Sequence, residues 1–379
     1  MIIVFVSNFI NHHQVHLADE FYGSNGVEYY FIETEPMPES FKSSGYPDYS
    51  SRPYVISAYK GSNDMKRSRH LIDNADVVII GSAPEAWVAK RLNDNKVTFH
   101  YSERWFKSGY KSLLSPREWY YLYRYHIRFR NKRSYMLCAS AFTASDVHRV
   151  FAYPNKCFKW GYFTEVPELD IEKILEAQKN ASRLRILWVA RFLTWKHPEL
   201  PVRLAKRLKD NGIDFELNMY GSGVESVNTK HLINKMNVAD CVNLCGNRPN
   251  EDIINIMRSH HIFLFTSDRN EGWGAVANEA MSNGCAVIAS GAIGSVPFLI
   301  NNGVNGLIFK DQDVNDLLNK TMLLINRPDL RADLVRKAYS TMHDVWSPRN
   351  AAKSFIKLAE SALDNNIKVP EVGPCSYSF

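Results

Sequence analysis

Short apolar runs alternate with helix-length segments along the chain, and this alternation restricts the available folds more than any other feature. Residues 2–6 form a continuous, β-branched run that is typical of a strand buried on both faces. Similar runs recur in the second half, for example at residues 185–189 and 262–266. Strands that alternate with helices predict parallel, doubly wound sheets, whose ligands bind beyond the carboxyl ends of the strands.

The length of the chain predicts two domains of this kind, because 379 residues exceed one ordinary domain. We expect an α/β protein with two Rossmann-like, doubly wound domains that face each other across a cleft. A C-terminal helix is expected to pack back toward the first domain. The predicted divisions are an N-terminal domain at 1–165, a linker at 166–182, a C-terminal domain at 183–346, a crossover helix at 347–366 and a flexible tail at 367–379.

The composition excludes several other classes of protein. Hydrophobic residues make up 45% of the chain and charged residues 23%, which is usual for a globular protein and unlike a disordered one. The apolar runs have the length of strands, so we expect neither a membrane-spanning helix nor a signal peptide. The six cysteines lack the spacing of a zinc or redox motif and are expected to be free thiols. A cytoplasmic location is expected.

A buried strand, a polar turn and a glycine-bearing helix start follow one another between residues 262 and 284. Gly272 and Gly274 would let the backbone approach a ligand closely. The free N–H groups of Gly274, Ala275 and Val276 would then face an anion, whose charge the helix dipole favours. The alternative is an ordinary strand–turn–helix without a ligand, because glycine-bearing helix starts are common.

Two carboxylates flank this helix start, Glu271 before it and Glu279 inside it. Carboxylates accept hydrogen bonds from pairs of hydroxyls, so they suit a sugar ring and a ribose. With seven residues between them, they resemble the Glu-x7-Glu signature of retaining glycosyltransferases, most closely family 4, which has the GT-B fold. Segments 187–196, 217–223 and 242–248 resemble the preceding strands and loops of that family in the same order.

The resemblance implies roles for the matching residues. Arg191 and Lys196 would neutralise the donor diphosphate as its bond to the sugar breaks, which is electrostatic stabilisation of a leaving group. Glu279 would hold the ribose hydroxyls, and Glu271 a hydroxyl of the donor sugar. Two cations on a loop are otherwise usually part of a solvated surface. The expected donor-binding residues are Arg191, Lys196, Gly221, Arg248, Glu271, Gly272, Trp273, Gly274, Ala275, Val276 and Glu279.

The first half of the chain offers further candidates. His100 resembles a cleft histidine of family 4 that lies near the reacting sugar, and a hydrogen-bonded structural role is the alternative. His12 and His13 follow the first strand and, with Glu103, are expected to line the cleft on the acceptor side. His12 and His16 have the spacing of a helical metal pair, but no HExxH pattern accompanies them and we expect no metal. The candidate catalytic residues are Glu271, His100, Arg191 and Lys196.

Residues 104–133 combine nine lysines and arginines with a single acid, Glu118, and aromatic residues alternate with the cations. Aromatic rings with polar tips beside cations suit a membrane–water interface. One alternative is a helix with its aromatic residues in the core and its cations in water. RNA binding is a third interpretation, but no RNA-binding signature accompanies the segment, and no nucleic acid is expected.

The resemblance implies a retaining, metal-independent glycosyltransferase without a resident cofactor. It would move a sugar from a UDP- or GDP-sugar, bound by the C-terminal domain, to a hydroxyl acceptor bound by the N-terminal domain. The acceptor is expected to be a lipid-linked saccharide of surface polysaccharide (O-antigen or capsule) synthesis, reached from the inner face of the cell membrane through residues 104–133. The alternatives are a nucleotide-sugar 2-epimerase on the same fold and a non-catalytic nucleotide-sugar-binding module.

Overall fold

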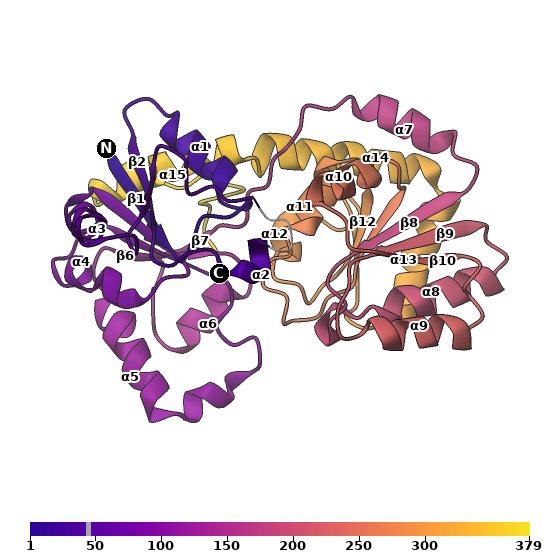
Figure 1. Cartoon of the computed structure of the whole chain (residues 1–379), viewed down its shortest axis with the longest axis horizontal. Coiled ribbons are helices and arrows are strands. Elements are labelled where there is room, and N and C mark those ends of the chain that lie inside the picture. Colours follow the sequence, from indigo (N-terminus) through magenta and orange to yellow (C-terminus); the bar gives the residue numbers. More distant parts are fainter. Residues whose placement is uncertain (43–46) are drawn as a thin grey trace. The chain divides into compact units, whose positions relative to one another are not determined.

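The structure is a computed structural model that describes residues 1–42 and 47–379. The chain divides into two compact units (Figure 1). Unit 1 comprises Met1–Glu165 and Val345–Phe379, and unit 2 comprises Val166–Asp344. Each unit is a parallel sheet with helices packed on it, so the predicted α/β fold of two Rossmann-like domains is confirmed.

Unit 1 is built on a seven-stranded sheet in the order β3-β2-β1-β4-β5-β6-β7, in which all neighbouring strands are parallel. The order reverses between β1 and β4, and this is the point at which ligands bind in open α/β sheets. The strands are β1 Ile2–Ser7, β2 Glu28–Glu33, β3 Val55–Ser57, β4 Val77–Ile80, β5 Thr98–Ser102, β6 Ser134–Cys138 and β7 Cys157–Lys159.

The helices of unit 1 include the last long helix of the chain, α15 (Pro348–Leu363), which packs against α1 (Val15–Tyr22) (Figure 1). The Ser347 side chain caps α15 by accepting a hydrogen bond from the Asn350 backbone N–H, and Pro348 occupies the first turn. The predicted crossover helix therefore returns to the first domain. The other helices are α2 Glu39–Lys42, α3 Ser62–Asn74, η1 Glu85–Trp87, α4 Ala89–Asn93, η2 Tyr110–Leu114, α5 Pro116–Tyr125, η3 Ile127–Phe129 and α6 Thr143–Arg149.

The last residues of the chain are packed, and the prediction of a flexible tail at 367–379 is wrong for this part of it. Cys375 is buried, and its backbone N–H donates to the carbonyl of Lys159, while the Lys159 N–H donates to the carbonyl of Ser376. Tyr377 forms an antiparallel bridge with Phe158 and contacts its ring. These bonds satisfy the edge of β7, which would otherwise present unpaired backbone groups.

Unit 2 is built on a six-stranded parallel sheet in the order β10-β9-β8-β11-β12-β13. The order again reverses beside the first strand, here between β8 and β11, so the loops after these two strands flank the expected ligand position. The strands are β8 Leu184–Val189, β9 Phe215–Tyr220, β10 Val242–Gly246, β11 Ile262–Phe265, β12 Ala286–Ser290 and β13 Leu307–Phe309.

The helices of unit 2 include α7 (Ile171–Lys179), which lies within the predicted linker at 166–182 and belongs to this unit. The Asp170 side chain caps α7, and the Gln178 amide donates to the carbonyls of His260 and Gly284, both at 2.9 Å. The other helices are η4 Thr194–Lys196, α8 Glu199–Asp210, α9 Ser226–Lys235, α10 Asn250–Arg258, α11 Val276–Ser282, α12 Val296–Leu299, α13 Val314–Asn326, α14 Pro328–Ser340 and η5 Thr341–Val345, in which the chain returns to unit 1.

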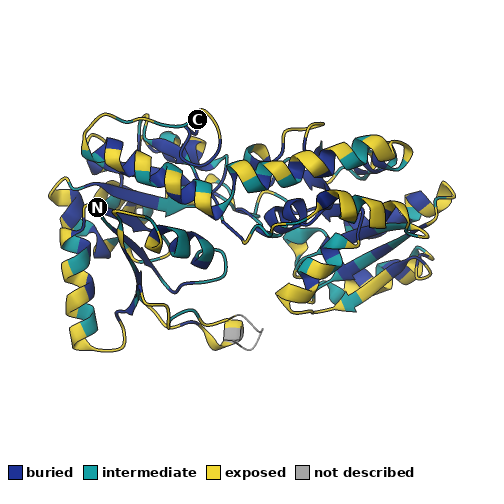
Figure 2. Cartoon of the chain, turned by 90° about the horizontal axis from the view of Figure 1, so that it is seen from above, coloured by how far each residue is buried: buried dark blue, intermediate teal, exposed yellow. Residues whose placement is uncertain are grey.

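The strands form the cores of the two units, and Figure 2 shows them mostly in dark blue while the helices alternate between buried and exposed faces. This pattern follows from strands that are covered on both sides by helices. Among the described residues, no helix combines the length and the apolar character needed to cross a bilayer.

Candidate functional site

In unit 2, Lys196 and Glu271 meet beyond the carboxyl ends of β8 and β11. The Lys196 ammonium donates to Glu271 Oε2 and forms an ion pair with it, and both side chains are about seven-eighths buried. The Ser267 hydroxyl donates to the same carboxylate oxygen at 3.0 Å. Two residues far apart in sequence are thus brought together at the point where the strand order reverses.

The loop that carries Lys196 is tied to the end of β11. The Thr266 hydroxyl donates to the Lys196 carbonyl at 2.7 Å and accepts from the Trp188 indole at 2.9 Å. The Asp268 backbone N–H donates to the Trp195 carbonyl at 2.9 Å. Such tethers hold the lysine near the carboxylate without relying on the ion pair alone.

His197 provides a further tether on the same loop. Its backbone is left-handed, with φ of 51°, and its ring lies 2.8 Å from Glu199 Oε1 and 3.4 Å from Asp268 Oδ2. Hydrogen bonding to Glu199, followed by the nearby charges of Glu199 and Asp268, raises the pKa of His197 despite partial burial. A left-handed non-glycine residue costs free energy, so the surrounding contacts must hold it in place.

Glu279 lies on α11 and is buried, as expected for the second carboxylate of the motif. Burial raises its pKa to about 7, and a 3.3 Å hydrogen bond from the Asn250 amide opposes this shift. A carboxylate in this position is poised to accept hydrogen bonds from a ligand, because few protein donors satisfy it.

Gly274 is the glycine of the motif whose conformation demands the absence of a side chain. Its φ is +75°, and a Cβ atom would lie 2.2 Å from the Phe265 ring and 3.3 Å from the Glu271 carboxyl carbon. Hydrogen bonds from Ala277 N–H to the Gly274 carbonyl and from Glu279 N–H to the Ala275 carbonyl start α11 here. The backbone N–H groups of Gly274, Ala275 and Val276 precede these bonds, as the motif predicts.

Backbone packing, rather than contact with a ligand, explains why residue 221 is a glycine. Its φ is +125°, and a Cβ atom would lie 2.0 Å from the carbonyl oxygen of Ala190. The strands continue past their ends here, because Ala190 N–H donates to the Tyr220 carbonyl and Gly221 N–H to the Gly246 carbonyl. Gly221 thus brings the loop after β9 against the backbone next to Arg191.

Arg191 and Arg248 lie on this same edge of the sheet with exposed side chains. Arg248 sits between Asn247, whose amide donates to the Ser222 hydroxyl at 2.8 Å, and Asn250, which contacts Glu279. The loop after β10 therefore reaches both the glycine turn after β9 and the buried carboxylate.

Trp273, a predicted donor-binding residue, has a side chain that faces the protein interior. The side chain is fully buried, and its indole N–H donates to Asn278 Oδ1 at 2.9 Å. Its carbonyl accepts from the Ser295 hydroxyl at 2.5 Å. The indole anchors the glycine turn to the core, and Gly272 beside it is also buried.

In unit 1, the candidates His13 and Glu103 meet through Tyr162. The His13 ring stacks on the Tyr162 ring with centroids 5.0 Å apart, and the tyrosine hydroxyl donates to Glu103 Oε1 at 2.6 Å. The His12 ring lies 3.6 Å from that of His13. Burial lowers the pKa of His12 to about 4, with His16 adding to the shift, and burial lowers that of His13 well below its ordinary value.

His100, on β5, belongs to a different cluster of contacts, with Glu85 and His126. Its Nδ1 lies 3.2 Å from Glu85 Oε2, and His126 Nε2 lies 4.0 Å from Glu85 Oε1. These three side chains line a cavity of about 320 Å³ in unit 1. The structure thus separates His100 from His12, His13 and Glu103.

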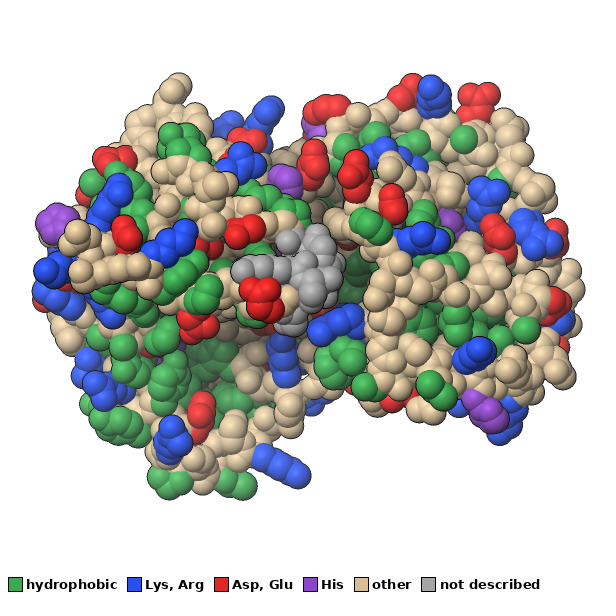
Figure 3. All heavy atoms as spheres, viewed as in Figure 1, with side chains coloured by type: hydrophobic (Ala, Val, Ile, Leu, Met, Phe, Trp, Pro, Cys, Tyr) green, Lys and Arg blue, Asp and Glu red, His purple; other side chains and the backbone are tan. Residues whose placement is uncertain are grey.

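The basic aromatic segment at 104–133 forms η2, α5 and η3, and much of it is exposed. Leu114, Tyr120 and Tyr123 are 85%, 62% and 58% exposed, beside the exposed cations Arg117 and Arg124. Figure 3 shows hydrophobic and cationic side chains interspersed over α5 at the lower left. The alternative in which all the aromatic residues of this segment lie in the core is wrong.

Sequence reasoning missed Thr266, Asp268, Glu85 and His126. Thr266 and Asp268 lie within the quoted motif, and their position at the end of a buried strand was an available signal. Glu85 and His126 lie on η1 and between α5 and η3, and their partnership depends on how the chain folds. No local pattern in the sequence marks it.

Two parallel sheets of Rossmann order, with the carboxylates and the lysine at the reversal point of the second, define the GT-B class of fold. The structure aligns with a glycosyltransferase from Rickettsia africae at a TM-score of 0.70 and 18% identity, covering 96% of this chain and 99% of that one. It also aligns with Anabaena HepE in complex with UDP, at a TM-score of 0.67 and 14% identity, covering 95% of this chain and all of HepE.

Residues 170–341, nearly all of unit 2, match the family of group 1 glycosyl transferases. The chain is 31% identical over 148 residues to an uncharacterized glycosyltransferase of Methanocaldococcus jannaschii, and 30% identical over 182 residues to the amylovoran biosynthesis glycosyltransferase AmsK of Erwinia amylovora. These matches cover 39% and 47% of this chain, and 40% and 44% of the relatives' own lengths. Together these findings show the GT-B fold and, over unit 2, similarity to the group 1 glycosyl transferases.

Proposed function

We propose that the protein is a retaining glycosyltransferase in which unit 2 binds a nucleotide-sugar donor and unit 1 binds a hydroxyl acceptor. The observation that carries this proposal is the Lys196–Glu271 ion pair beyond the reversal point of the unit 2 sheet, with the buried Glu279 on the helix that follows Glu271. A diphosphate needs cations, and a sugar and a ribose need hydrogen-bond acceptors. The site offers both on loops held by several tethers.

In the proposed reaction, the acceptor oxygen forms a bond to the anomeric carbon while the bond from that carbon to the β-phosphate oxygen breaks. The acceptor proton passes to the departing phosphate, so no protein nucleophile is required. Lys196 and Arg191 would stabilise the negative charge that grows on the diphosphate. Because these cations supply that charge, the transfer itself is proposed to be metal-independent.

The nucleotide-sugar is proposed to carry uridine or guanosine diphosphate. HepE, which shares the fold, has been seen with UDP and with UDP and glucose. In this chain, Glu279 would accept from the ribose hydroxyls and Glu271 from a hydroxyl of the sugar. Donor binding would then transfer Lys196 from its pairing with Glu271 to a position shared with the diphosphate.

The acceptor is proposed to be a lipid-linked saccharide of surface polysaccharide synthesis. The name of AmsK assigns that relative to amylovoran biosynthesis, and the exposed aromatic and basic side chains of α5 suit an anionic membrane surface. The protein would work at the inner face of the cell membrane, with its acceptor delivered there by the lipid.

The test is donor-dependent turnover of the full chain. UDP-, GDP-, ADP- and dTDP-sugars would be offered with membrane lipid extract, and nucleoside diphosphate release and glycolipid formation would be followed. We expect release from one UDP- or GDP-sugar, and a loss of about a hundredfold or more in Glu271→Gln, because it removes a charged contact to the reacting sugar. Nuclear magnetic resonance of the product should show the donor's anomeric configuration.

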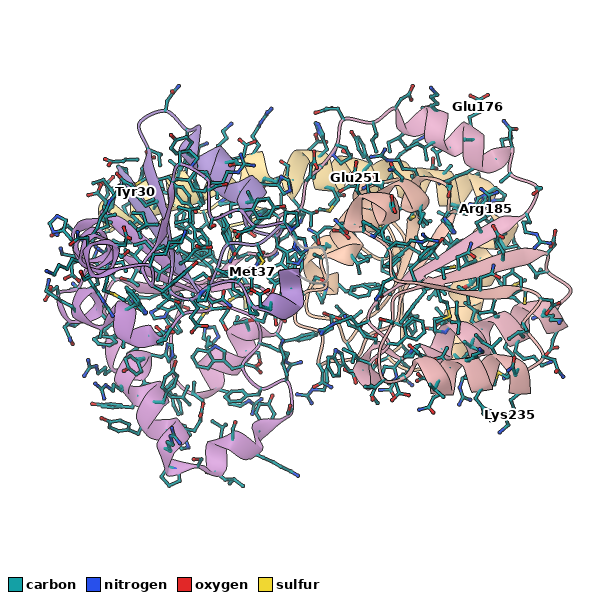
Figure 4. The ribbon with its side chains drawn as sticks, viewed as in Figure 1. Tyr30, Met37, Glu176, Arg185, Lys235 and Glu251 are labelled. Atoms are coloured by element: carbon teal, nitrogen blue, oxygen red, sulfur yellow. The ribbon has the colours of Figure 1, made fainter. Side chains whose placement is uncertain are left out.

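Glu176→Gln is the matched control, because Glu176 is an exposed glutamate on α7 (Figure 4). It should retain wild-type turnover. Isomerised donor formed without an acceptor would replace the proposal with a 2-epimerase. Donor binding without turnover under any of these conditions would favour a non-catalytic binding module.

Membrane contact can be tested separately by cosedimentation with vesicles. We expect binding to phosphatidylglycerol-containing vesicles that weakens with added salt, and little binding to phosphatidylcholine alone. The double change Arg117→Glu and Arg124→Glu should reduce binding at least tenfold, because each cation contributes about 1 kcal/mol near an anionic surface. Lys235→Glu, on α9, is the control; equal loss in both variants would contradict a specific role for α5.

A further inference from the structure

A second cluster of polar side chains lies in unit 1, whereas the residues assigned to the donor belong to unit 2. Glu85, on η1, His100, on β5, and His126, between α5 and η3, each point one ligand-capable atom at the others. These atoms all lie within 4.8 Å of one another. Among the described residues, this is the one set of three or more histidine, cysteine or acidic side chains that converges in this way.

The distances in this cluster match what a small metal ion requires. Tetrahedral Zn²⁺ with ligands at about 2.05 Å places neighbouring ligand atoms about 3.3 Å apart. His100 Nδ1 lies 3.3 Å from Glu85 Oε1 and 3.2 Å from Oε2, and His126 Nε2 lies 4.0 Å from Oε1. Small side-chain rotations would bring the histidine nitrogen atoms and one carboxylate oxygen around a single ion.

Two polar atoms of the cluster lack hydrogen bonds within the described part of the protein. These are Nε2 of His100, a side chain that is 98% buried, and Oε2 of Glu85. Buried polar atoms without partners are rare and costly in native proteins. An ion bound between Glu85 and Nδ1 of His100 would give Oε2 of Glu85 a partner, whereas Nε2 of His100 lies on the other side of its ring.

Histidine binds a metal ion through a neutral imidazole and glutamate through a carboxylate, so the side chains of this cluster are of the types that metal binding needs.

The second ring nitrogen of His126 already has a hydrogen-bond partner. Its Nδ1 lies 2.6 Å from the hydroxyl of the buried Tyr153, which would fix the tautomer and leave Nε2 free to bind an ion. Ligating histidines typically make such a bond through their second nitrogen. Tyr153 is therefore a positioning residue for the cluster.

We propose that Glu85, His100 and His126 bind a divalent transition-metal ion, with Zn²⁺ as the ion that best suits two imidazoles and a carboxylate. The cavity of about 320 Å³ beside them leaves a fourth coordination position open, and Glu118, Trp105 and Tyr121 line the same space. The ion would there bind water or an oxygen of a small ligand. The site belongs to unit 1 and the donor residues to unit 2, and the proposal does not rest on the proposed transfer reaction.

The test is direct binding of metal to the full chain after treatment with a chelator and dialysis. Calorimetric titration with ZnCl₂ should show one ion per chain, with a dissociation constant of micromolar or tighter. Co²⁺ should give the visible absorption of a four- or five-coordinate site, and Zn²⁺ should displace it. Zn²⁺ should also raise the melting temperature of the wild-type protein.

Two ligand variants and one positioning variant identify the site. Glu85→Gln and His126→Gln should each weaken Zn²⁺ binding at least tenfold, and Tyr153→Phe by about tenfold through loss of the hydrogen bond to His126. His70→Gln is the matched control, because His70 is an exposed histidine on α3. Circular dichroism would establish that each variant is folded.

The proposal is overturned if the wild-type protein binds no Zn²⁺ or Co²⁺, since the cluster is then a hydrogen-bonded charge network. It is equally overturned if folded Glu85→Gln and His126→Gln bind Zn²⁺ as tightly as His70→Gln does. Both outcomes are independent of turnover, so they leave the proposed transferase activity untouched.

Discussion

At the scale of single residues, burial decides what Glu271 and Glu279 can do. Glu271 accepts hydrogen bonds from Lys196 and Ser267, whereas Glu279 is buried and accepts from the Asn250 amide. The two carboxylates of one motif thus meet opposite environments. Burial raises the pKa of Glu279, so this carboxyl needs a ligand, or a proton, to offset its burial.

The pH dependence of stability should report the raised pKa of Glu279. The pKa is about 7 in the folded protein against an ordinary value of 4.5. The protonated carboxyl therefore contributes its full stabilisation below about pH 4.5, and this stabilisation is lost as the pH rises through 7. Glu279→Gln lacks this titration. It should therefore gain about 3 kcal/mol relative to the wild type between pH 4.5 and pH 8.

Urea unfolding at pH 5 and pH 8 measures this difference, with Glu176→Gln as the exposed control. The control should parallel the wild type at both pH values. An unchanged difference between Glu279→Gln and the wild type across this range would show that the carboxyl titrates normally.

A local motif in the sequence marks the two carboxylates, and Lys196 was named from the resemblance of residues 187–196 to the family with that motif. The sequence did not predict the role of Trp273, since a tryptophan beside two glycines is compatible with both a ligand face and a core anchor. Only the packing of its indole against Asn278 decides between them. The cluster of Glu85, His100 and His126 could not be predicted from the sequence either, because its three residues come from segments that are separated in the chain.

At the scale of elements, the loops after β8, β9 and β10 form one continuous structure. Backbone hydrogen bonds continue the strand pairing past the ends of the strands. Gly221 permits its backbone to lie close to the Ala190 carbonyl. The position of Arg191 therefore depends on a glycine in a neighbouring loop. A change at that glycine should disturb both stability and the diphosphate site.

Gly221→Ala should destabilise unit 2 by about 3 kcal/mol, which combines the cost of a positive φ with a backbone clash. Its Cβ would lie 2.0 Å from the Ala190 carbonyl oxygen. Gly212→Ala is the matched control: its φ is +69° but no atom lies within 4 Å of the added Cβ, so it should cost only about 1 kcal/mol. Thermal unfolding of both variants checks this, and equal losses would contradict the packing argument.

The long, apolar strands were predictable because their runs are continuous and bounded by polar turns. The edge strands β3 and β7 were not, since each has only three residues and owes its conformation to the neighbouring strand. The conformation of the tail at 367–379 likewise depends on a neighbouring strand. Its two prolines and a glycine predict a loose segment, yet its backbone satisfies the exposed edge at β7.

At the scale of the whole molecule, two sheets with the same strand order occur in one chain. In each, the first strand lies at the reversal point, and the candidate residues follow strands that flank it. Unit 2 gathers cations and carboxylates there, whereas unit 1 gathers neutral histidines, tyrosines and one carboxylate near its own strand ends. This difference supports the proposal that the units bind chemically different partners.

Unit 2 is proposed to bind a nucleoside diphosphate through Lys196. Calorimetric titration of the full chain with UDP and GDP tests it directly, using Lys196→Ala and, as control, Lys235→Ala, an exposed lysine at the end of α9 (Figure 4). We predict that one of the two nucleotides binds the wild type and the control equally, and binds Lys196→Ala at least tenfold more weakly, as expected for a lost charge-assisted contact. Binding of neither nucleotide, or equal binding by both variants, would contradict the claim.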